Sequence, residues 1–348
     1  MSSELSDSLT IWYRENRRDL AFRRTRDPYA ILVAEVLLQR TRIASGLPYF
    51  ERFMARFPTV ADLAAASEEE VLKAWEGLGF YGRARNLRRA AKAVMRDHGG
   101  RIPGTFSGLR GLPGIGDYTA GAVASIAFGE AVPAIDGNAA RVLARVFRLG
   151  GDFTRGEGRR RLMAIASSLV PAMEPGTHNQ ALMELGSTVC RPKAPRCPAC
   201  PVHSLCGAFA EGRPEAYPER REQKPVPIVR VAFALAEREG RVLLVRRPAD
   251  GLLAGLWALP GGEVPPQESE TTVLRKALRG IGVKARLGGA IGTVRHTFSH
   301  RQWTGHVLRA HVPAMARLPE GAIWAGPKDL RRLPLVPLHR RVLEQSRL

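Results

Sequence analysis

The segment Cys190–Cys206 reads CRPKAPRCPACPVHSLC and holds all four cysteines of the 348-residue chain. Their spacing, Cys-x6-Cys-x2-Cys-x5-Cys, supplies four thiolates, which is the number that a [4Fe–4S] cluster binds. Prolines recur between the cysteines and favour turns over helix, so the segment can wrap around a bound group. The sequence therefore predicts an iron–sulfur loop whose ligands are Cys190, Cys197, Cys200 and Cys206.

Two alternatives use the same cysteines. Disulfides are disfavoured because both bridges would lie within one short loop of a long chain without an apparent signal peptide. A zinc site with four cysteine ligands is the more serious alternative. Zinc knuckles usually contain two short Cys-x2-Cys pairs, and this segment has one, so iron and sulfur are the preferred interpretation.

The chain carries 53 Lys and Arg against 33 Asp and Glu, a net charge of +20. This excess points to a polyanionic partner, with nucleic acid ahead of an anionic membrane; a generally arginine-rich surface is the alternative. No apolar run approaches the ~20 residues of a membrane span. Residues 1–7 are polar, so we expect no signal peptide and a bacterial-type, nucleoid-associated protein of the reducing cytoplasm.

Two kinds of sequence follow one another along the chain. Residues 1–210 are mostly of helical character. Residues 211–227 combine prolines with charges, which predicts a linker. Residues 228–348 contain β-forming segments around a helical stretch, which predicts a separate α+β domain. We expect helices near 27–40, 68–75, 83–96, 119–128, 138–147 and 267–278, and strands near 228–236, 241–246, 290–297 and 302–312, with a hairpin turn at 239–240.

The stretch Leu112-Pro-Gly-Ile-Gly116 separates two helical segments. Its glycines allow a tight turn that exposes backbone N–H groups at the start of the next helix, where a phosphate can bind without its sequence being read. A bare Gly-x-Gly also suits a plain connector. Between the helices of a basic chain it favours a helix-hairpin-helix clamp, with Leu112, Gly114 and Gly116 at the DNA.

Two carboxylates have surroundings suited to cleavage of a glycosidic bond. Glu35 lies among apolar or small residues from 29 to 38, so its carboxyl group should lose water and its pKa should rise, which suits proton donation. Asp136, in Ile135-Asp-Gly-Asn138, would be the ionised group that faces a cationic transition state. The alternatives are a glutamate that reaches solvent and an aspartate that only caps the next helix.

The hairpin, Asp136 and the cysteine loop together resemble the helix-hairpin-helix DNA glycosylases of the endonuclease III superfamily, and within them the MutY family of A/G-specific adenine DNA glycosylases. The resemblance implies an all-α glycosylase domain with an iron–sulfur loop that acts in base excision repair. Its motifs are Asp27-Pro-Tyr29, Ala34–Gln39, Gly77–Asn86, Leu112–Gly116, Ile135–Asn138 and the four cysteines.

Tyr118 stands where bifunctional members of this superfamily have a lysine nucleophile. A tyrosine forms no Schiff base, so the resemblance implies a monofunctional glycosylase with at most weak lyase activity. Glu35 would protonate adenine and later manage the attacking water, while Asp136 would stabilise the oxocarbenium ion. Tyr118 and Asn138 would hold that assembly in place.

The resemblance also implies which residues meet the DNA. Tyr81 would enter the base stack while adenine is flipped out. Arg40, next to Gln39, departs from the family, which usually has glutamine there. A related thymine glycosylase that acts on G/T mismatches also has arginine near this position and tyrosine at the position of Tyr118. Removal of thymine from G/T mismatches is therefore the alternative function. The adenine pocket would be formed by Phe22, Arg23, Leu38 and Gln180.

Residues 251–262 and the helical stretch after them resemble a Nudix fold. Gln267, Lys276, Arg279 and Gly280 replace the carboxylates of a working Nudix box, so we expect no pyrophosphate hydrolysis. The loop Phe298-Ser-His300 is similar to the one by which MutY enzymes recognise 8-oxoguanine. Ser299 would bond to the edge of the lesion, with His300 beside it and Phe298 as anchor. The expected partner is double-stranded DNA with adenine opposite 8-oxoguanine or guanine, bound by a monomer.

Overall fold

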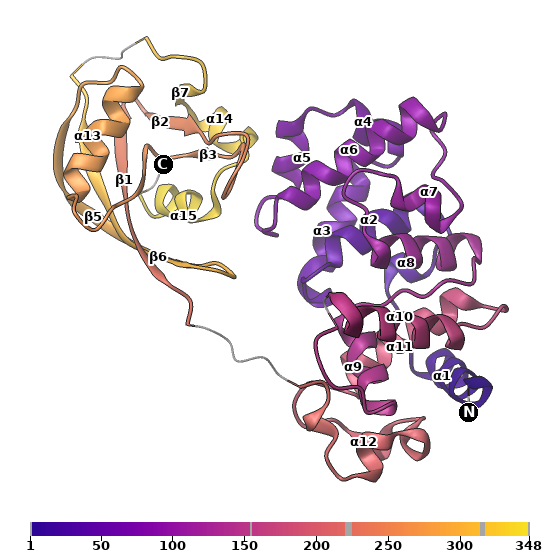
Figure 1. Cartoon of the computed structure of the whole chain (residues 1–348). Coiled ribbons are helices and arrows are strands. Elements are labelled where there is room, and N and C mark those ends of the chain that lie inside the picture. The colour runs from indigo at the N-terminus through magenta and orange to yellow at the C-terminus, as the bar shows by residue number, and fades with distance from the viewer. Residues whose placement is uncertain (1, 154, 220–224, 314–316, 347–348) are drawn as a thin grey trace. The chain divides into compact units, whose positions relative to one another are not determined.

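The computed structural model describes residues 2–153, 155–219, 225–313 and 317–346. It divides into two compact units, which are Met1–Ala65 with Asn86–Glu222, and Ala66–Arg85 with Gln223–Leu348. The first unit is helical and the second contains a β-sheet (Figure 1). None of the described helices is long and apolar enough to cross a membrane.

Short helices joined by tight loops make up the first unit. The helices expected near 83–96, 119–128 and 138–147 are confirmed, with boundaries shifted by one or two residues. The helix expected near 27–40 is confirmed but ends at Leu38. The elements are α1 (Ser2–Asn16), η1 (Ala21–Arg23), α2 (Pro28–Leu38), α3 (Ile43–Arg56), α4 (Val60–Ala65), α6 (Gly82–Asp97), α7 (Phe106–Arg110), α8 (Asp117–Phe128), α9 (Gly137–Val146), α10 (Gly156–Leu169), α11 (Pro175–Thr188), η2 (Cys197–Ala199), η3 (His203–Leu205), α12 (Gly207–Ala210) and η4 (Pro214–Ala216).

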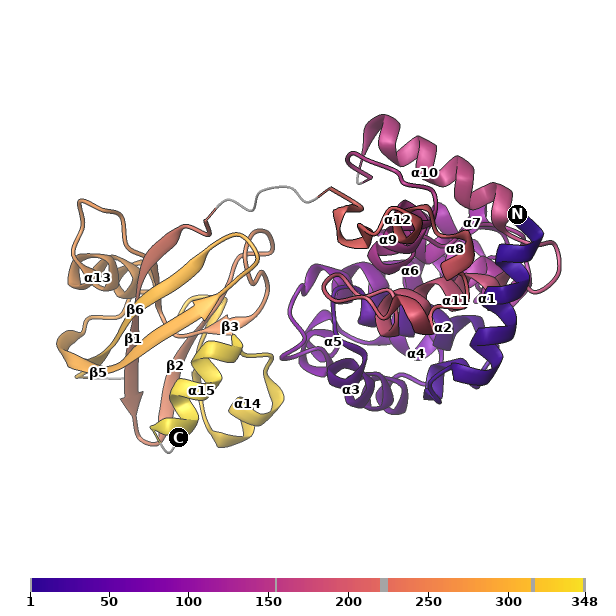
Figure 2. The same ribbon diagram turned by 90° about the horizontal axis from the view of Figure 1, so that it is seen from below.

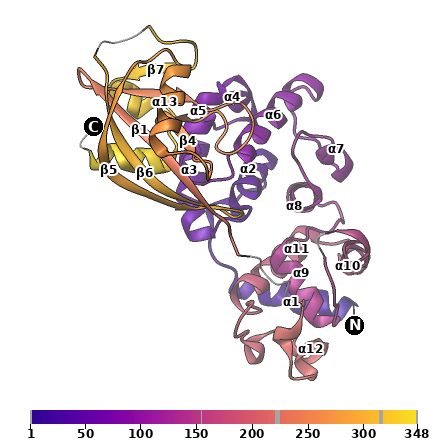
Figure 3. The ribbon, with the colours of Figure 1, turned by 60° about the vertical axis from the view of Figure 1, so that its left-hand side comes forward.

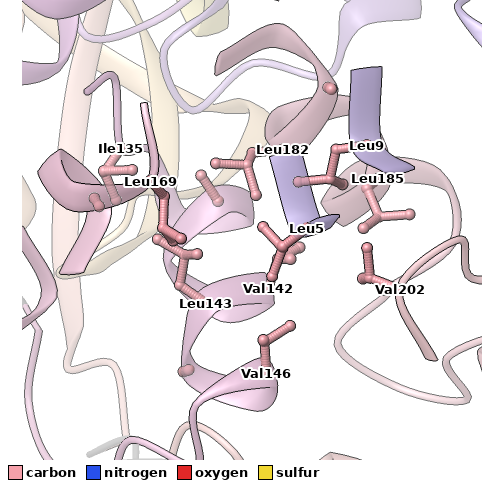
Figure 4. Close-up of a cluster of buried hydrophobic side chains, with 14 of the residues drawn as sticks. Leu5, Leu9, Ile135, Val142, Leu143, Val146, Leu169, Leu182, Leu185 and Val202 are labelled. Carbon is pink, nitrogen blue, oxygen red and sulfur yellow. The ribbon is translucent and has the colours of Figure 1, made fainter. Parts of the chain in front are cut away.

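One apolar core holds α1, α9, α10 and α11 together. Leu5 and Leu9 from α1 meet Val142 of α9 and Leu182 of α11 in this cluster (Figure 4). Burying leucine and valine side chains of this size stabilises the fold by about 1.5–3 kcal/mol each. Val202 of the cysteine loop packs into the same cluster, so the loop is anchored on the helices that carry the candidate site.

A close approach of two backbones places Asp136 near α8. A Cβ atom at Gly121 would lie 2.2 Å from the carbonyl oxygen of Pro133, so only glycine lets the segment before α9 run so close to α8. Asn179 of α11 fixes the same segment, because its Oδ1 accepts from the Ala134 N–H at 3.1 Å. Tyr118 is one helical turn before Gly121 and therefore lies on the same face of α8.

The second unit is a mixed seven-stranded sheet in the order β3-β2-β1-β6-β5, with β4 paired to β1 and β7 paired to β2. β1 runs parallel to β6, and the other pairs are antiparallel (Figure 3). The expected strands and the two-residue hairpin turn after Arg238 are confirmed. The elements are β1 (Ile228–Arg238), β2 (Arg241–Arg246), β3 (Trp257–Ala258), β4 (Gly261–Glu263), α13 (Glu270–Gly280), β5 (Arg286–Thr297), β6 (Gln302–His311), β7 (Ala322–Ala325), α14 (Pro327–Arg332) and α15 (Pro337–Gln345).

Helices cover both faces of this sheet (Figure 2). Ala232 and Ala234 of β1 pack in one cluster with Leu274 of α13. Phe233, which points to the opposite face because side chains alternate along a strand, contacts His339 of α15 with 4.2 Å between ring centres. β1 is therefore buried on both faces, and this burial fixes the β1–β2 hairpin in the sheet.

Residues 66–85 group with the sheet rather than with the rest of the helical sequence, which the sequence did not indicate. The expected helix near 68–75 is present as α5 (Glu68–Ala74). Its Glu69 accepts a hydrogen bond from the Trp257 indole at 3.1 Å, and Glu76 just after it pairs with Arg340. Residues 220–224 of the expected linker lie outside the described residues. Earlier in that stretch, the Tyr217 carbonyl accepts from Nε of Arg145 at 3.0 Å.

Candidate active site

Glu35 is carried by α2, a helix with a well-defined start. The Asp27 side chain caps it by accepting from the N–H groups of Tyr29 and Ala30, and Pro28 occupies its first position. Nearly every other residue of α2 is buried. Although Glu35 keeps some exposed surface, burial of its carboxyl group raises its pKa from 4.5 to about 7.

Tyr118 is the hydrogen-bond partner of this carboxyl group. Its hydroxyl donates to Oε2 of Glu35 and lies 3.5 Å from the sulfur of Met183. Burial raises the pKa of Tyr118 well above its ordinary value of 10, so the tyrosine stays neutral and acts as a donor. It has no amine with which to attack a sugar carbon.

Asp136 caps α9, as the structural alternative expected, and it also lies close enough to Glu35 for its charge to raise the pKa of that residue. Its carboxylate accepts from the N–H groups of Asn138 and Ala139 at 2.9 and 2.7 Å, and from Nδ2 of Asn138 at 2.8 Å. Burial raises the pKa of Asp136, and these hydrogen bonds oppose it by favouring the ionised form. Helix capping therefore gives this carboxylate hydrogen bonds that favour its ionised form.

A chain of hydrogen bonds runs from Asp136 to the cysteine loop. Nη2 of Arg141 donates to Oδ1 of Asn138 at 3.0 Å, and Nε of the same arginine donates to the Cys190 carbonyl at 2.8 Å. One guanidinium thus fixes both the residue that holds Asp136 and the first cysteine of the loop. No pattern in the sequence singles out Arg141, which stands one turn after Gly137 on α9.

A cleft of about 850 Å³ brings several of the expected site residues together. The residues that line it include Leu38, Gln39, Arg40, Tyr118, Asp136 and Asn138. Phe22 of η1 stacks edge-on against Phe50, with ring centres 5.9 Å apart. Gln180 accepts from the Tyr13 hydroxyl at 3.0 Å. Arg23, the fourth expected adenine-pocket residue, pairs with the buried Glu184, which sequence reasoning missed.

The hairpin has the tight geometry that its glycines predicted. Gly114 has a φ of +74°, and a Cβ atom there would lie 2.4 Å from Cβ of Asn86. Leu112 is buried, whereas Gly116 is exposed and caps the N-terminus of α8. Asp117, the first residue of that helix, pairs with Arg110 and Arg159.

The other expected DNA-facing residues differ in exposure. Gln39 donates to the Thr119 hydroxyl at 2.8 Å, and the exposed Arg40 has a φ of +57°, which non-glycine residues seldom adopt. Tyr81 is only 5% exposed, and its hydroxyl accepts from the Gly77 N–H at 3.1 Å. Phe80, which is 45% exposed, is the more accessible aromatic side chain of that loop.

All four cysteines line one small cavity together with Arg145. Among the described residues, no three His, Cys, Asp or Glu side chains converge on a position for a single ion. Four thiols around one cavity form a donor set that suits a [4Fe–4S] cluster, and a zinc site with four cysteine ligands would use the same set. Arg145, which is 2% exposed, donates to Sγ of Cys190 at 3.3 Å and supplies a fixed positive charge.

In the second unit, Phe298, Ser299 and His300 form the tip of the β5–β6 hairpin. The Phe298 ring packs on Trp303 and His296, with ring centres 5.0 and 4.4 Å apart. Its N–H donates to the Arg301 carbonyl at 2.8 Å, which closes the turn. Ser299 and His300 are exposed. The tip therefore presents two polar side chains on an aromatic anchor.

The raised pKa of Glu35 predicts a pH-dependent stability. Between pH 4.5 and about 7 the folded protein holds a proton that the unfolded chain has lost, so stability falls as pH rises through this range. Glu35→Gln should therefore raise the free energy of unfolding by up to about 3 kcal/mol at pH 8 and leave it unchanged at pH 4. Denaturant unfolding at both pH values tests this, with the exposed Glu51→Gln as control. An equal effect of Glu35→Gln at pH 4 and pH 8 would contradict the desolvated carboxyl group.

Two family models match successive parts of the chain. Residues 33–168 match the model of the HhH-GPD superfamily base excision DNA repair proteins, and residues 231–345 match that of the NUDIX domain. A solved thermostable thymine-DNA glycosylase is 30% identical, with a TM-score of 0.55, over 60% of this chain and 97% of its own. Endonuclease III in a trapped DNA complex, at 23% identity and a TM-score of 0.52, shares the fold. The expected fold class is confirmed.

Adenine DNA glycosylases from distant organisms match most of the chain. That of Homo sapiens is 37% identical over 91% of this chain and 69% of its own length. That of Schizosaccharomyces pombe is 30% identical over 89% and 78%, and one from Buchnera aphidicola is 32% identical over 72% and 71%. The chain therefore belongs to the MutY family of adenine DNA glycosylases, enzymes of base excision repair.

Proposed function

We propose that this enzyme removes adenine paired with 8-oxoguanine or guanine in double-stranded DNA, by hydrolysing the N-glycosidic bond as a monomer. One observation carries the proposal: Tyr118 is hydrogen-bonded to Glu35 beside Asp136, and burial raises the pKa of Glu35 to about 7. A carboxyl group with that pKa holds a proton near neutral pH and can release it in the transition state. A nucleoid in a bacterial-type cytoplasm is where such an enzyme would meet its substrate.

In the proposed reaction, Glu35 gives its proton to N7 of the flipped adenine. The bond between the sugar C1′ and the base then breaks, and both electrons leave with the base. Asp136 stabilises the resulting oxocarbenium ion through its negative charge. Glu35, now a carboxylate, takes a proton from water as the water oxygen adds to C1′. The products are free adenine and an abasic site, and the acid is regenerated.

Tyr118 and Asn138 act as positioning residues in this reaction. The neutral Tyr118 hydroxyl holds the Glu35 carboxyl group, and the Asn138 amide holds Asp136. Neither can form a Schiff base with the sugar, which supports a monofunctional enzyme. Phe22, Arg23, Leu38 and Gln180 are proposed to enclose the adenine.

The DNA is held by backbone groups and by a few side chains. The amides at Gly114 and Gly116 and the neighbouring Leu112 are proposed to meet the phosphate backbone. Gln39 and Arg40, at the cleft, are proposed to face the unpaired bases. Tyr81 is proposed to enter the base stack, which requires its hydroxyl to leave the Gly77 N–H.

The second unit is proposed to read 8-oxoguanine. Ser299 and His300 are exposed polar groups held by the packed Phe298 ring, so they can bond to the edge of the lesion without reordering the hairpin. Residues 228–348 would form this recognition domain, 1–210 the catalytic domain and 211–227 the linker between them.

The four cysteines are proposed to hold a [4Fe–4S] cluster. When bound, the cluster supplies a rigid, charged centre that closes the loop 190–206. Within the protein, Arg145 donates a hydrogen bond to Sγ of Cys190. Arg141 donates to the Cys190 carbonyl and to Oδ1 of Asn138, and so links the two residues. Basic side chains within the loop are available to phosphates, and they are Arg191, Lys193 and Arg196.

A substrate panel tests the activity. In single-turnover reactions, duplexes with A:8-oxoG should be cleaved fastest, A:G more slowly and T:G not at all. Glu35→Gln should lower the rate on A:8-oxoG by about 10²–10⁴-fold, because the general acid is lost, and should leave duplex binding intact. Cleavage of T:G alone, or retained turnover by Glu35→Gln, would refute the proposal.

Lesion recognition is tested by the double variant Ser299→Ala with His300→Ala. Loss of hydrogen bonds to the lesion should weaken binding of A:8-oxoG about tenfold and change that of A:G less than about twofold. His311→Ala, an exposed histidine at the far end of β6, is the matched control. An equal loss of affinity for both duplexes would contradict the proposal that these two side chains recognise the lesion.

Cluster binding is tested by purifying the enzyme without oxygen. The protein should be brown and contain about four iron atoms per chain. Cys200→Ser should lose the visible absorbance, and Ser204→Ala in the same loop should keep it. A colourless protein that contains zinc would contradict the assignment.

A further inference from the structure

Glu263, the last residue of β4, binds two residues that follow the tip of the β5–β6 hairpin. Its Oε1 accepts from Nη1 of Arg301 at 2.6 Å and from the indole N–H of Trp303 at 3.3 Å. The carbonyl of Arg301 accepts from the Phe298 N–H, and the Trp303 ring packs on the Phe298 ring. One carboxylate oxygen therefore joins two of the groups that hold Phe298, the residue next to Ser299.

The two hydrogen bonds of Glu263 differ in what they contribute. The side chains of Glu263 and Arg301 are 44% and 33% exposed, so solvent weakens their ion pair. Trp303 is only 1% exposed, and its indole N–H donates to the same carboxylate oxygen. A buried donor that loses its acceptor is costly, so we expect the indole to fix the carboxylate and the carboxylate to fix Arg301 in turn.

The register of the sheet brings Glu263 to the face that carries Trp303. Glu263 lies opposite Val231 of β1, and Val231 lies opposite Gly305 of β6. Trp303 is two residues before Gly305, so its side chain points to the same face as that of Glu263. The contact between β4 and the start of β6 therefore follows from the strand pairing and not from the conformation of a loop.

Other acidic side chains that follow β4 have partners of their own. Glu268 pairs with Lys276 at 2.9 Å, and Glu270 lies 2.9 Å from Nδ1 of His306. In the described parts of the chain these carboxylates do not converge on a position for a metal ion. They therefore serve separate contacts, and the contact of Glu263 lies beside the hairpin tip.

We propose that Glu263 is a positioning residue for recognition of 8-oxoguanine: it holds the two residues that support Phe298, so that Ser299 and His300 keep one orientation toward the lesion. The inference rests on the proposed lesion recognition by this hairpin. It adds that the choice between 8-oxoguanine and guanine depends on a carboxylate of β4, a strand that does not belong to the hairpin.

Removing Glu263 also removes a negative charge from a protein that binds a polyanion. This change alone strengthens binding to any duplex, because less charge repulsion opposes it. The effect is equal for A:8-oxoG and A:G, since both duplexes carry the same phosphates. The ratio of the two dissociation constants therefore separates lesion recognition from charge.

Equilibrium binding measures this ratio, taken as Kd for A:G divided by Kd for A:8-oxoG, with 2′-fluoroadenosine in place of adenosine so that the base is not excised. Glu263→Ala should lower the ratio about fivefold, because both hydrogen bonds are lost. Glu263→Gln keeps an acceptor for the indole and should lower it about twofold. The control Glu268→Gln removes the same charge and breaks the pair with Lys276, and it should leave the ratio unchanged.

A second comparison separates positioning from stability. In the background of Ser299→Ala with His300→Ala, adding Glu263→Ala should change the ratio less than about 1.5-fold, because the side chains that it positions are absent. A residue that only stabilised the fold would lower the melting temperature and leave the ratio unchanged in both backgrounds. Glu263→Gln carries the test if Glu263→Ala does not fold.

A wild-type ratio in both Glu263 variants would overturn the inference if Ser299→Ala with His300→Ala lowers that ratio. The same loss from Glu263→Ala with and without the two tip side chains would also overturn it, since Glu263 would then act elsewhere. If the tip variant itself keeps the wild-type ratio, the proposed lesion recognition fails, and the inference fails with it.

Discussion

Glu35 lies in the middle of an apolar helix, and the scarcity of water around its carboxyl group is the constraint on which the rest of the site depends. A buried carboxylate without a partner costs several kcal/mol, so the group keeps a proton at neutral pH instead. Tyr118 offers one hydrogen bond to it, which is enough to orient the group and too little to ionise it. A strong partner such as an arginine within contact would remove the proton that the proposed chemistry needs.

The fold places a second carboxyl group, that of Asp136, close enough to Glu35 for its charge to raise the pKa of Glu35. Gly121 allows the segment before α9 to run against α8, and the turn into α9 then makes Asp136 its cap. The backbone N–H groups that a helix start leaves unpaired become the donors that favour the ionised Asp136. Arg141 extends this arrangement to the Cys190 carbonyl, so one side chain joins the cysteine loop to α9.

Local structure that depends on residues adjacent in the sequence could be predicted from the sequence. The apolar run around Glu35, the hairpin glycines and the alternating strands specify local structure, and each lies where the pattern placed it. The ion pair between Arg18 and Glu184 joins positions 166 residues apart, and no pattern in either segment identifies the partner. The same holds for Arg141 and for the grouping of residues 66–85 with the sheet. The burial of Tyr81 depends on the conformation of its loop, which periodicity does not specify.

The central claim is that burial, assisted by the charge of Asp136, makes Glu35 an acid suited to neutral pH. Its most direct test is the titration of that single carboxyl group by NMR, with ¹³C-labelled glutamate and Glu35→Gln to assign the signal. The account predicts a carboxyl chemical shift that titrates with a pKa near 7, in the free enzyme and without DNA. A Glu35 signal that titrates near the ordinary value of 4.5 would contradict it.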